Sequence, residues 1–76
     1  LRINYNETSS QIDRQLRAFS FREYQLPKFN QYEIKNWEIT TKKSKIKPGS
    51  IINEIGNKIQ ISTIDYDMNL WIENYK

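Results

Sequence analysis

The first regular pattern along the chain is an apolar stripe with helical spacing. Ile12, Leu16 and Phe19 fall at positions i, i+4 and i+7, so that all three lie on one face of a helix. A face of this kind is buried against the rest of a small protein. The spacing therefore predicts one amphipathic helix over about residues 9–19.

The start and the surface of this helix are also marked in the sequence. Thr8-Ser9-Ser10-Gln11 has the form of a capping box, in which the Thr8 hydroxyl serves the amide of Gln11 and the Gln11 side chain reaches back. Asp13 and Arg17 are four residues apart, the spacing of an ion pair on a helix surface. We expect the helix to begin directly after Thr8.

The apolar positions lose their helical period after the helix. Pro27 has no amide hydrogen to donate and forces Leu26 into an extended conformation, so residues 20–30 are predicted to form an ordered loop. Phenylalanine rings have no polar group that needs a partner. We therefore expect three of them, Phe19, Phe21 and Phe29, to pack in the core and pin the loop to the helix.

From Tyr32 onward the period changes to two, which is typical of a half-buried strand. Tyr32 and Ile34 share one parity, whereas Trp37 and Ile39 share the other. One regular strand cannot turn both pairs inward. We therefore predict a bulge near residues 35–36, which would bend the strand around a small barrel.

Further strands follow a polar run that ends at the turn pair Pro48-Gly49. Gly56-Asn57 separates two alternating segments and favours a type II′ hairpin turn, because glycine stands first. After the Asp65-Tyr66-Asp67 turn the alternation resumes, with Met68, Leu70 and Ile72 on one face and Trp71 on the other. The predicted strands cover about residues 32–41, 50–55, 58–63 and 68–75.

These elements indicate a single, mainly β domain. The connections between strands are too short for crossovers, so the strands are antiparallel. Closing the sheet removes exposed edges. We predict a small, partly open antiparallel barrel with one N-terminal helix packed on it.

Composition limits the chemistry of this domain. The 76 residues include no cysteine and no histidine, which excludes disulfides, thiolate or imidazole metal sites and the usual nucleophilic triads. Asp65 and Asp67 look like a carboxylate pair, but beside a tight turn we interpret them as turn formers. We predict that this chain alone has no catalytic, cofactor-binding or metal-binding residues.

Charge and exposed rings give the candidate binding surface. The net charge is +3, a mild excess, and the densest positive cluster is Lys42, Lys43, Lys45 and Lys47. With Arg22 and Lys28 these side chains are candidates for contact with phosphates, although we favour a solvated loop because lysine lacks the bidentate geometry of arginine. The rings that we consider for stacking on bases are Tyr24, Trp37 and Trp71.

The order of these features resembles a known family. The phrase IDRQLRAFSF, an aromatic and proline loop, the strand QYEIKNWEI and then KPGSIINEIGNKIQISTIDYDMNLWI are similar to the C-terminal domain of the methionyl-tRNA formyltransferase-like family. The most specific matches are Arg17-Ala18 at the end of the helix and Pro48-Gly49 before the hairpin that continues to Thr63. The resemblance covers about residues 8–72 and implies an open OB-like barrel.

The resemblance also implies a division of labour between domains. Enzymes of the family carry their catalytic Asn, His and Asp and their 10-formyltetrahydrofolate site in an upstream Rossmann-like domain. Their C-terminal domain is accessory and helps to bind tRNA, or supports oligomer contacts or the wall of the site in nucleotide-sugar N-formyltransferases. Since this chain opens at Leu1 without methionine, we expect it to be a fragment of such an enzyme, located in the cytoplasm.

Two departures from the family pattern separate its branches. The loop reads FREYQLPKF, without the Trp-Pro-Gly-Ala-like sequence usual in the tRNA enzymes, and the domain is shorter and less basic than theirs. Both departures favour a parent enzyme that formylates a nucleotide-linked amino sugar. The alternatives are a tRNA-binding domain, a stand-alone OB-like nucleic-acid-binding module, and an interaction domain that uses Trp71 in a homodimer. The candidate surface comprises Arg22, Tyr24, Lys42, Lys43, Lys45, Lys47 and Trp71, and no part of it is expected to contact a membrane.

Overall fold

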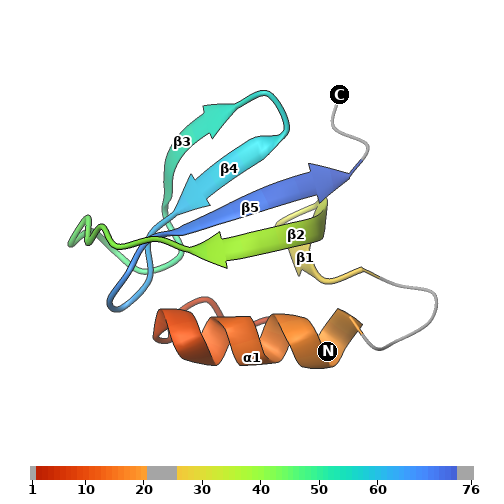
Figure 1. The fold of residues 1–76 in the computed structure, drawn as a ribbon, viewed down its shortest axis with the longest axis horizontal. Helices are drawn as coiled ribbons and strands as arrows, with labels where there is room; N and C mark the ends of the chain where they lie inside the picture. The colour runs from red at the N-terminus through yellow and green to blue at the C-terminus, as the bar shows by residue number, and fades with distance from the viewer. Residues whose placement is uncertain (1, 21–25, 74–76) are drawn as a thin grey trace.

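The computed structural model describes residues 2–20 and 26–73, in which one helix packs against a five-stranded antiparallel sheet (Figure 1). The strand order is β1-β2-β5-β4-β3, and the sheet curves into an open half-barrel. This architecture confirms the predicted mainly β fold with one N-terminal helix. The elements are α1 (Ser9–Ser20), β1 (Lys28–Phe29), β2 (Tyr32–Ile39), β3 (Ile51–Ile55), β4 (Lys58–Ile61) and β5 (Met68–Glu73).

The helix begins with the predicted capping box. The Thr8 amide donates to Gln11 Oε1 at 3.1 Å, and the Gln11 amide donates to Thr8 Oγ1 at 3.3 Å. These bonds satisfy two of the amides that a helix leaves without partners at its start. The Arg17 guanidinium lies 3.1 Å from the Asp13 carboxylate, as the spacing predicted. The helix ends at Ser20, where the hydroxyl donates to the Leu16 carbonyl at 2.8 Å.

The core lies between the helix and the concave face of the sheet. Ile12 and Leu16 are fully buried, as the helical stripe predicted, and Phe29 is buried as well. Phe19 is only half-buried, and Phe21 lies outside the described residues. The strands complete the core with Ile34, Ile59, Ile61, Met68, Leu70 and Ile72.

The predicted bulge lies in β2. The pairing with β5 shifts between Ile34 and Asn36, and beyond the shift Trp37 lies opposite Leu70, just as Ile34 lies opposite Ile72. Residues of both parities therefore share the inner face, because directly paired residues point to the same side of a sheet. Ile39 at the end of the strand is nevertheless 41% exposed.

The hairpin between β3 and β4 has the predicted geometry. Gly56 has a φ of 58°, whereas the φ of Asn57 is not positive, which fits a type II′ turn and excludes type I′. Ile55 lies opposite Lys58 across this turn. The second predicted feature of this region, alternation along β4, buries Ile59 and Ile61.

One strand was not predicted. Lys28–Phe29 forms β1 and pairs with Tyr32–Glu33, within the segment that we interpreted as a loop. Two residues are too few to show an alternating pattern, and the tight turn between the strands relies on Asn30 with a φ of 55°, a conformation that asparagine tolerates. Within the described ranges, no helix is long and apolar enough to cross a membrane.

Candidate functional surface

The predicted lysine cluster lies in a loop that a buried carboxylate holds in place. In this lysine loop (residues 40–49), the Ser44 amide and hydroxyl donate to the Asp67 carboxylate at 3.1 and 2.6 Å. The Asp67 amide donates to the Lys42 carbonyl at 2.7 Å, and the Thr40 amide donates back to the Asp67 carbonyl at 2.9 Å. Asp67 itself is only 2% exposed. It is therefore a loop anchor, in line with its predicted structural role.

The second end of the lysine loop is held by a turn. The Ser50 amide donates to the Lys47 carbonyl at 3.2 Å, with Pro48 and Gly49 between them and Gly49 at a φ of 85°. This combination is typical of a type II turn. The buried Ser62 hydroxyl also donates to the Lys47 carbonyl, at 2.6 Å. The backbone of the loop is thus fixed at both ends.

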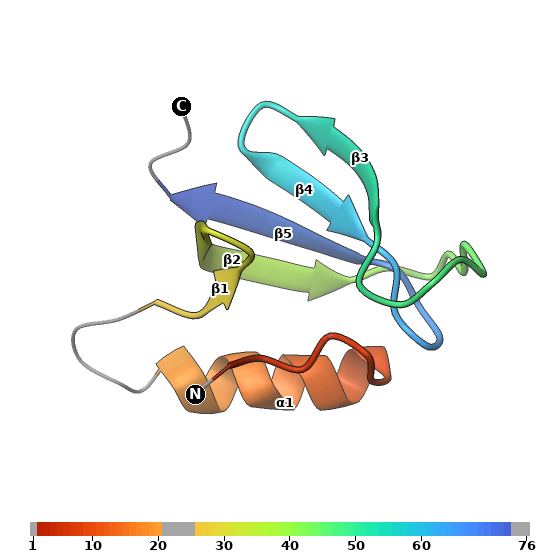
Figure 2. The same ribbon diagram turned by 180° about the vertical axis from the view of Figure 1, so that it is seen from behind.

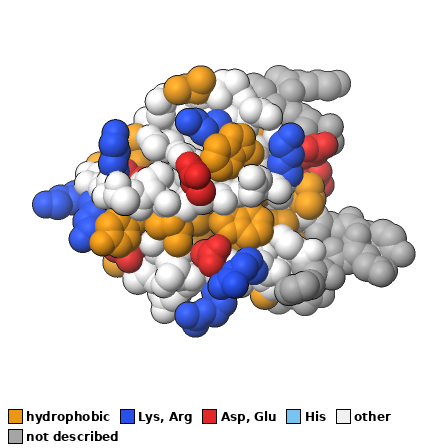
Figure 3. Space-filling view, in the orientation of Figure 1, with side chains coloured by type: hydrophobic (Ala, Val, Ile, Leu, Met, Phe, Trp, Pro, Cys, Tyr) orange, Lys and Arg blue, Asp and Glu red, His pale blue; other side chains and the backbone are white. Residues whose placement is uncertain are grey.

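The lysine side chains point to solvent from this fixed backbone. All four predicted lysines are exposed, and Lys and Arg side chains project from the end of the molecule at which the lysine loop lies (Figures 1 and 3). Lys43 Nζ lies 4.9 Å from the centre of the Tyr66 ring, within the range of a cation–π contact. Tyr66, which is 38% exposed, is the ring beside the cluster, although the sequence indicated only a turn at this position.

The predicted stacking ring Trp71 lies elsewhere, on the outer face of the sheet. It is half-buried and is flanked in register by Asn36 and Lys58. Two residues before it on the same face, Asn69 donates to the Glu38 carboxylate at 2.8 Å and accepts from Gln60 at 3.0 Å. The outer face therefore combines a ring with amides and charges of both signs.

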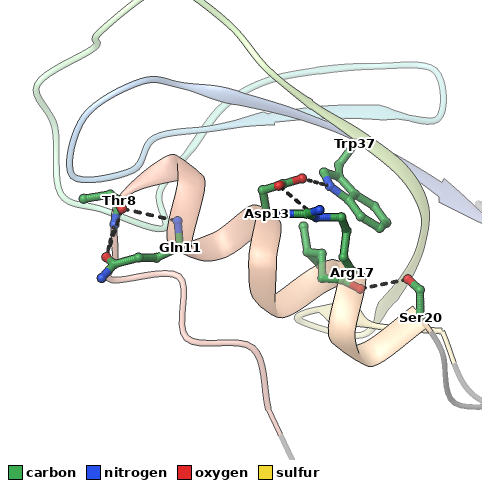
Figure 4. Close-up of polar contacts among 7 residues, drawn as sticks. Thr8, Gln11, Asp13, Arg17, Ser20 and Trp37 are labelled. Atoms are coloured by element: carbon green, nitrogen blue, oxygen red, sulfur yellow. Dashed lines mark hydrogen bonds and ion pairs between the residues drawn. The ribbon is translucent and has the colours of Figure 1, made fainter.

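Trp37, the other predicted stacking ring in the described residues, is engaged in the fold. Its Nε1–H donates to Asp13 Oδ1 at 2.8 Å, while Asp13 Oδ2 forms the ion pair with the Arg17 guanidinium (Figure 4). The carboxylate thereby links the middle of α1 to β2. Sequence spacing had shown only the Asp13–Arg17 pair, because the tryptophan is far away along the chain.

The comparison with protein families agrees with this fold. The sequence model described as formyl transferase, C-terminal domain, matches residues 1–76. The chain belongs to this family. No curated protein sequence matches it.

Within this formyl transferase C-terminal domain, the remaining predicted site residues are not brought to one place. Lys28 pairs with Glu33 at the start of β2, whereas the lysine loop follows the end of that strand (Figure 1). Arg22 and Tyr24 lie outside the described residues. The lysines and Tyr66 form one surface, and Trp71 belongs to another.

Asp65 has a structural role in the domain. It accepts hydrogen bonds from the Ser9 amide at 2.8 Å and from the Tyr66 amide at 2.6 Å, so it joins the start of α1 to the turn before β5. Burial alone would raise the pKa of Asp65, but these bonds and those of the Ser9 and Thr63 side chains lower it below its ordinary value. In the described residues, no cluster of acidic side chains is arranged to hold a metal ion.

Proposed function

We propose that this formyl transferase C-terminal domain is the non-catalytic, accessory part of a folate-dependent enzyme that formylates a nucleotide-linked amino sugar. In the parent enzyme, the amine nitrogen attacks the formyl carbon of 10-formyltetrahydrofolate. The bond from that carbon to folate N10 would then break, the proton lost by the amine would pass to N10, and tetrahydrofolate would leave. The Asn, His and Asp that serve this step belong to the upstream Rossmann-like domain of the parent.

The residues described here do not fit a folate site. Every buried side-chain nitrogen or oxygen in the described part of the chain has a hydrogen-bond partner, so no buried polar group is left to recognise a pterin or a glutamate. Among the described residues, Asp67 is the one buried charged side chain, and its carboxylate is used to hold the lysine loop. This supports the proposal that the folate site belongs to the upstream domain.

The separation of Trp71 from the lysine cluster is the observation that supports the sugar acceptor. A surface for tRNA needs many phosphate contacts and gains from bases stacked on rings. Here Trp71 lies on a face that also carries Glu38, which would repel phosphates, and Glu73, which lies 3.7 Å from Lys35. Together with the FREYQLPKF loop and the net charge of only +3, this mixed face favours a small acceptor bound mainly by the catalytic domain.

A formylation assay with the full-length parent tests this proposal. The purified enzyme is given 10-formyltetrahydrofolate with either a panel of nucleotide-linked amino sugars or aminoacylated initiator tRNA, and formylated product is measured by mass spectrometry. We expect at least one sugar to be formylated at more than ten times the rate of the tRNA. Formylation of tRNA alone would overturn the proposal.

The tRNA-binding alternative is favoured by one observation, the position of Lys43 over Tyr66 in a loop with a fixed backbone. It predicts that charge reversal at Lys42, Lys43, Lys45 and Lys47 lowers the affinity for tRNA and flattens its dependence on salt. Under the sugar proposal, the same quadruple variant formylates its sugar acceptor within about a factor of two of the wild-type rate, because surface substitutions usually have small effects and the catalytic domain supplies most of the contacts to the sugar.

A further inference from the structure

The N-terminal segment (residues 2–7) lies along α1, although the sequence pattern predicted no element there. It runs from the end of the helix toward its start, antiparallel to it (Figure 2). The Gln15 side chain holds this segment by its backbone: the Asn4 amide donates to Gln15 Oε1 at 2.7 Å, and Gln15 Nε2 donates to the Asn4 carbonyl at 2.9 Å. One carboxamide thus satisfies both backbone groups of Asn4, as a neighbouring strand would.

Further contacts fix the same segment to two other parts of the fold. The Tyr5 hydroxyl donates to the Lys28 carbonyl of β1 at 2.6 Å, and its ring meets the Phe29 ring edge-on with the centres 5.0 Å apart. The Glu7 carbonyl accepts from the Ile64 amide at 3.0 Å. Ile3 and Tyr5 also pack against the core. The N-terminal segment is therefore bound at three places, to α1, to β1 and to the loop before β5.

A segment with these contacts does not behave as a flexible linker. Linkers swing freely where their backbone is solvated and makes no fixed contacts. Here the amide and the carbonyl of Asn4 are both hydrogen-bonded, and the neighbouring side chains, Ile3 and Tyr5, are partly buried against the core. The direction of the chain at Arg2 is consequently set by the domain, beside the end of α1 (Figures 1 and 2).

We propose that the N-terminal segment is a clamp that holds the upstream catalytic domain in one orientation, on the side where α1 ends, with Gln15 as its positioning residue. This inference rests on the function proposed above, since that function supplies the upstream domain. The partner is then the preceding domain of the same polypeptide. An accessory domain that shapes the wall of an active site needs a fixed orientation of this kind, because small displacements of positioning groups lower rates steeply.

The distance between the two domains tests the clamp in the full-length parent. Since this chain contains no cysteine, one exposed residue, Thr41→Cys, carries a spin label here and a second label is placed on the catalytic domain. Double electron–electron resonance then gives the distribution of interdomain distances. Gln15→Met removes both hydrogen bonds to Asn4 but keeps a long side chain that favours helix. Gln31→Met, at an exposed position in the turn between β1 and β2, is the matched control.

We expect a narrow distance distribution for the wild type and for Gln31→Met, and one at least twice as broad for Gln15→Met. Amide exchange at Asn4 should accelerate about tenfold or more in Gln15→Met, because its acceptor is lost. Tyr5→Phe, which keeps the ring contact with Phe29, should broaden the distribution to a smaller degree. A loss of general stability alone would lower the melting temperature and leave the distances unchanged.

Two results overturn the clamp: a broad distribution in the wild type, or an unchanged distribution in Gln15→Met once exchange at Asn4 has accelerated. The formylation assay on the same preparations keeps the two proposals apart. Formylation of a sugar with broad distances rejects the clamp and leaves the proposed function standing. Narrow distances that broaden in Gln15→Met, with no sugar formylated, support the clamp and reject the proposed function.

Discussion

The strands β3 and β5 belong to the same sheet, but their apolar side chains differ strongly in exposure to solvent. β3 contains three isoleucines in five residues, yet Ile55 is 60% exposed and Ile51 is 39% exposed. β5 is less rich in isoleucine, and Leu70 is fully buried. The difference comes from the strand order, because β5 lies between β2 and β4 whereas β3 has one neighbour. Alternation in a sequence shows which side chains share a face, and the packing around each strand decides whether that face is covered.

The largest predicted effect is a loss of stability at the buried strand, β5. Leu70→Ala should lower the free energy of unfolding by about 2–5 kcal/mol, because it removes buried contacts and leaves a cavity. Urea denaturation followed by tryptophan fluorescence measures this loss. A loss below 1 kcal/mol would mean that the center of β5 is not the packed core that we describe.

The next prediction concerns Asp67, the residue directly before β5, which holds the lysine loop. Asp67→Ala should cost about 1–3 kcal/mol, because the Ser44 amide and hydroxyl lose the carboxylate that accepts from them. Amide exchange at Ser44 should accelerate together with the loss of stability. Asp67→Asn is the control, since it keeps one acceptor oxygen. Equal losses in the two variants would contradict the assigned role of the carboxylate.

A smaller effect is expected where β2, the neighbor of β5, is tied to the helix. Asp13→Asn keeps an acceptor for Trp37 Nε1–H but loses the ion pair with Arg17, which is worth only about 0.3–0.5 kcal/mol at such a surface position. Asp13→Ala loses both partners and should cost about 1 kcal/mol more. Indistinguishable unfolding curves for the two variants would show that the Trp37 bond does not stabilise the domain.

The loop before β5 should give the domain a dependence on pH. Because the pKa of Asp65 is lowered by folding, its carboxylate stabilises the folded state above the unfolded pKa of about 3.9, and this contribution is lost as the pH falls through the lower, folded value. Asp65→Asn should therefore be less stable than the wild type at pH 7 by about 0.3–1 kcal/mol, the usual effect of an anion at a helix start. The difference should shrink below pH 4. A difference that grows on acidification would contradict the direction of the shift.

Local signals account for the parts of the fold that the sequence predicted. The capping box, the bulge near residues 35–36 and the Gly56-Asn57 turn each depend on residues close together in the chain. Such signals are readable because turn and cap geometries accept few residue types. The exposed position of the four lysines was predictable for a different reason, since a charged side chain is costly to bury, whereas their role in binding stays a prediction.

Contacts between distant residues account for what the sequence did not predict. The bond from Trp37 to Asp13, the position of Lys43 over Tyr66 and the hold of Gln15 on Asn4 each join different elements. No spacing rule connects such positions before the topology is known. The presence of a tyrosine in the turn before β5 was the one available signal for Tyr66, since a large ring in a turn often remains exposed.

The smallest predicted effect is at the exposed edge. Ile55→Thr keeps a β-branched side chain, which suits a strand, and removes apolar surface that is already mostly in water. The free energy of unfolding should therefore change by less than about 0.5 kcal/mol, far less than for Leu70→Ala. The free energy of unfolding of the wild type and of Ile55→Thr is measured at two protein concentrations tenfold apart. A loss above 1 kcal/mol that grows with concentration would show that another chain covers β3, since only association makes stability depend on concentration.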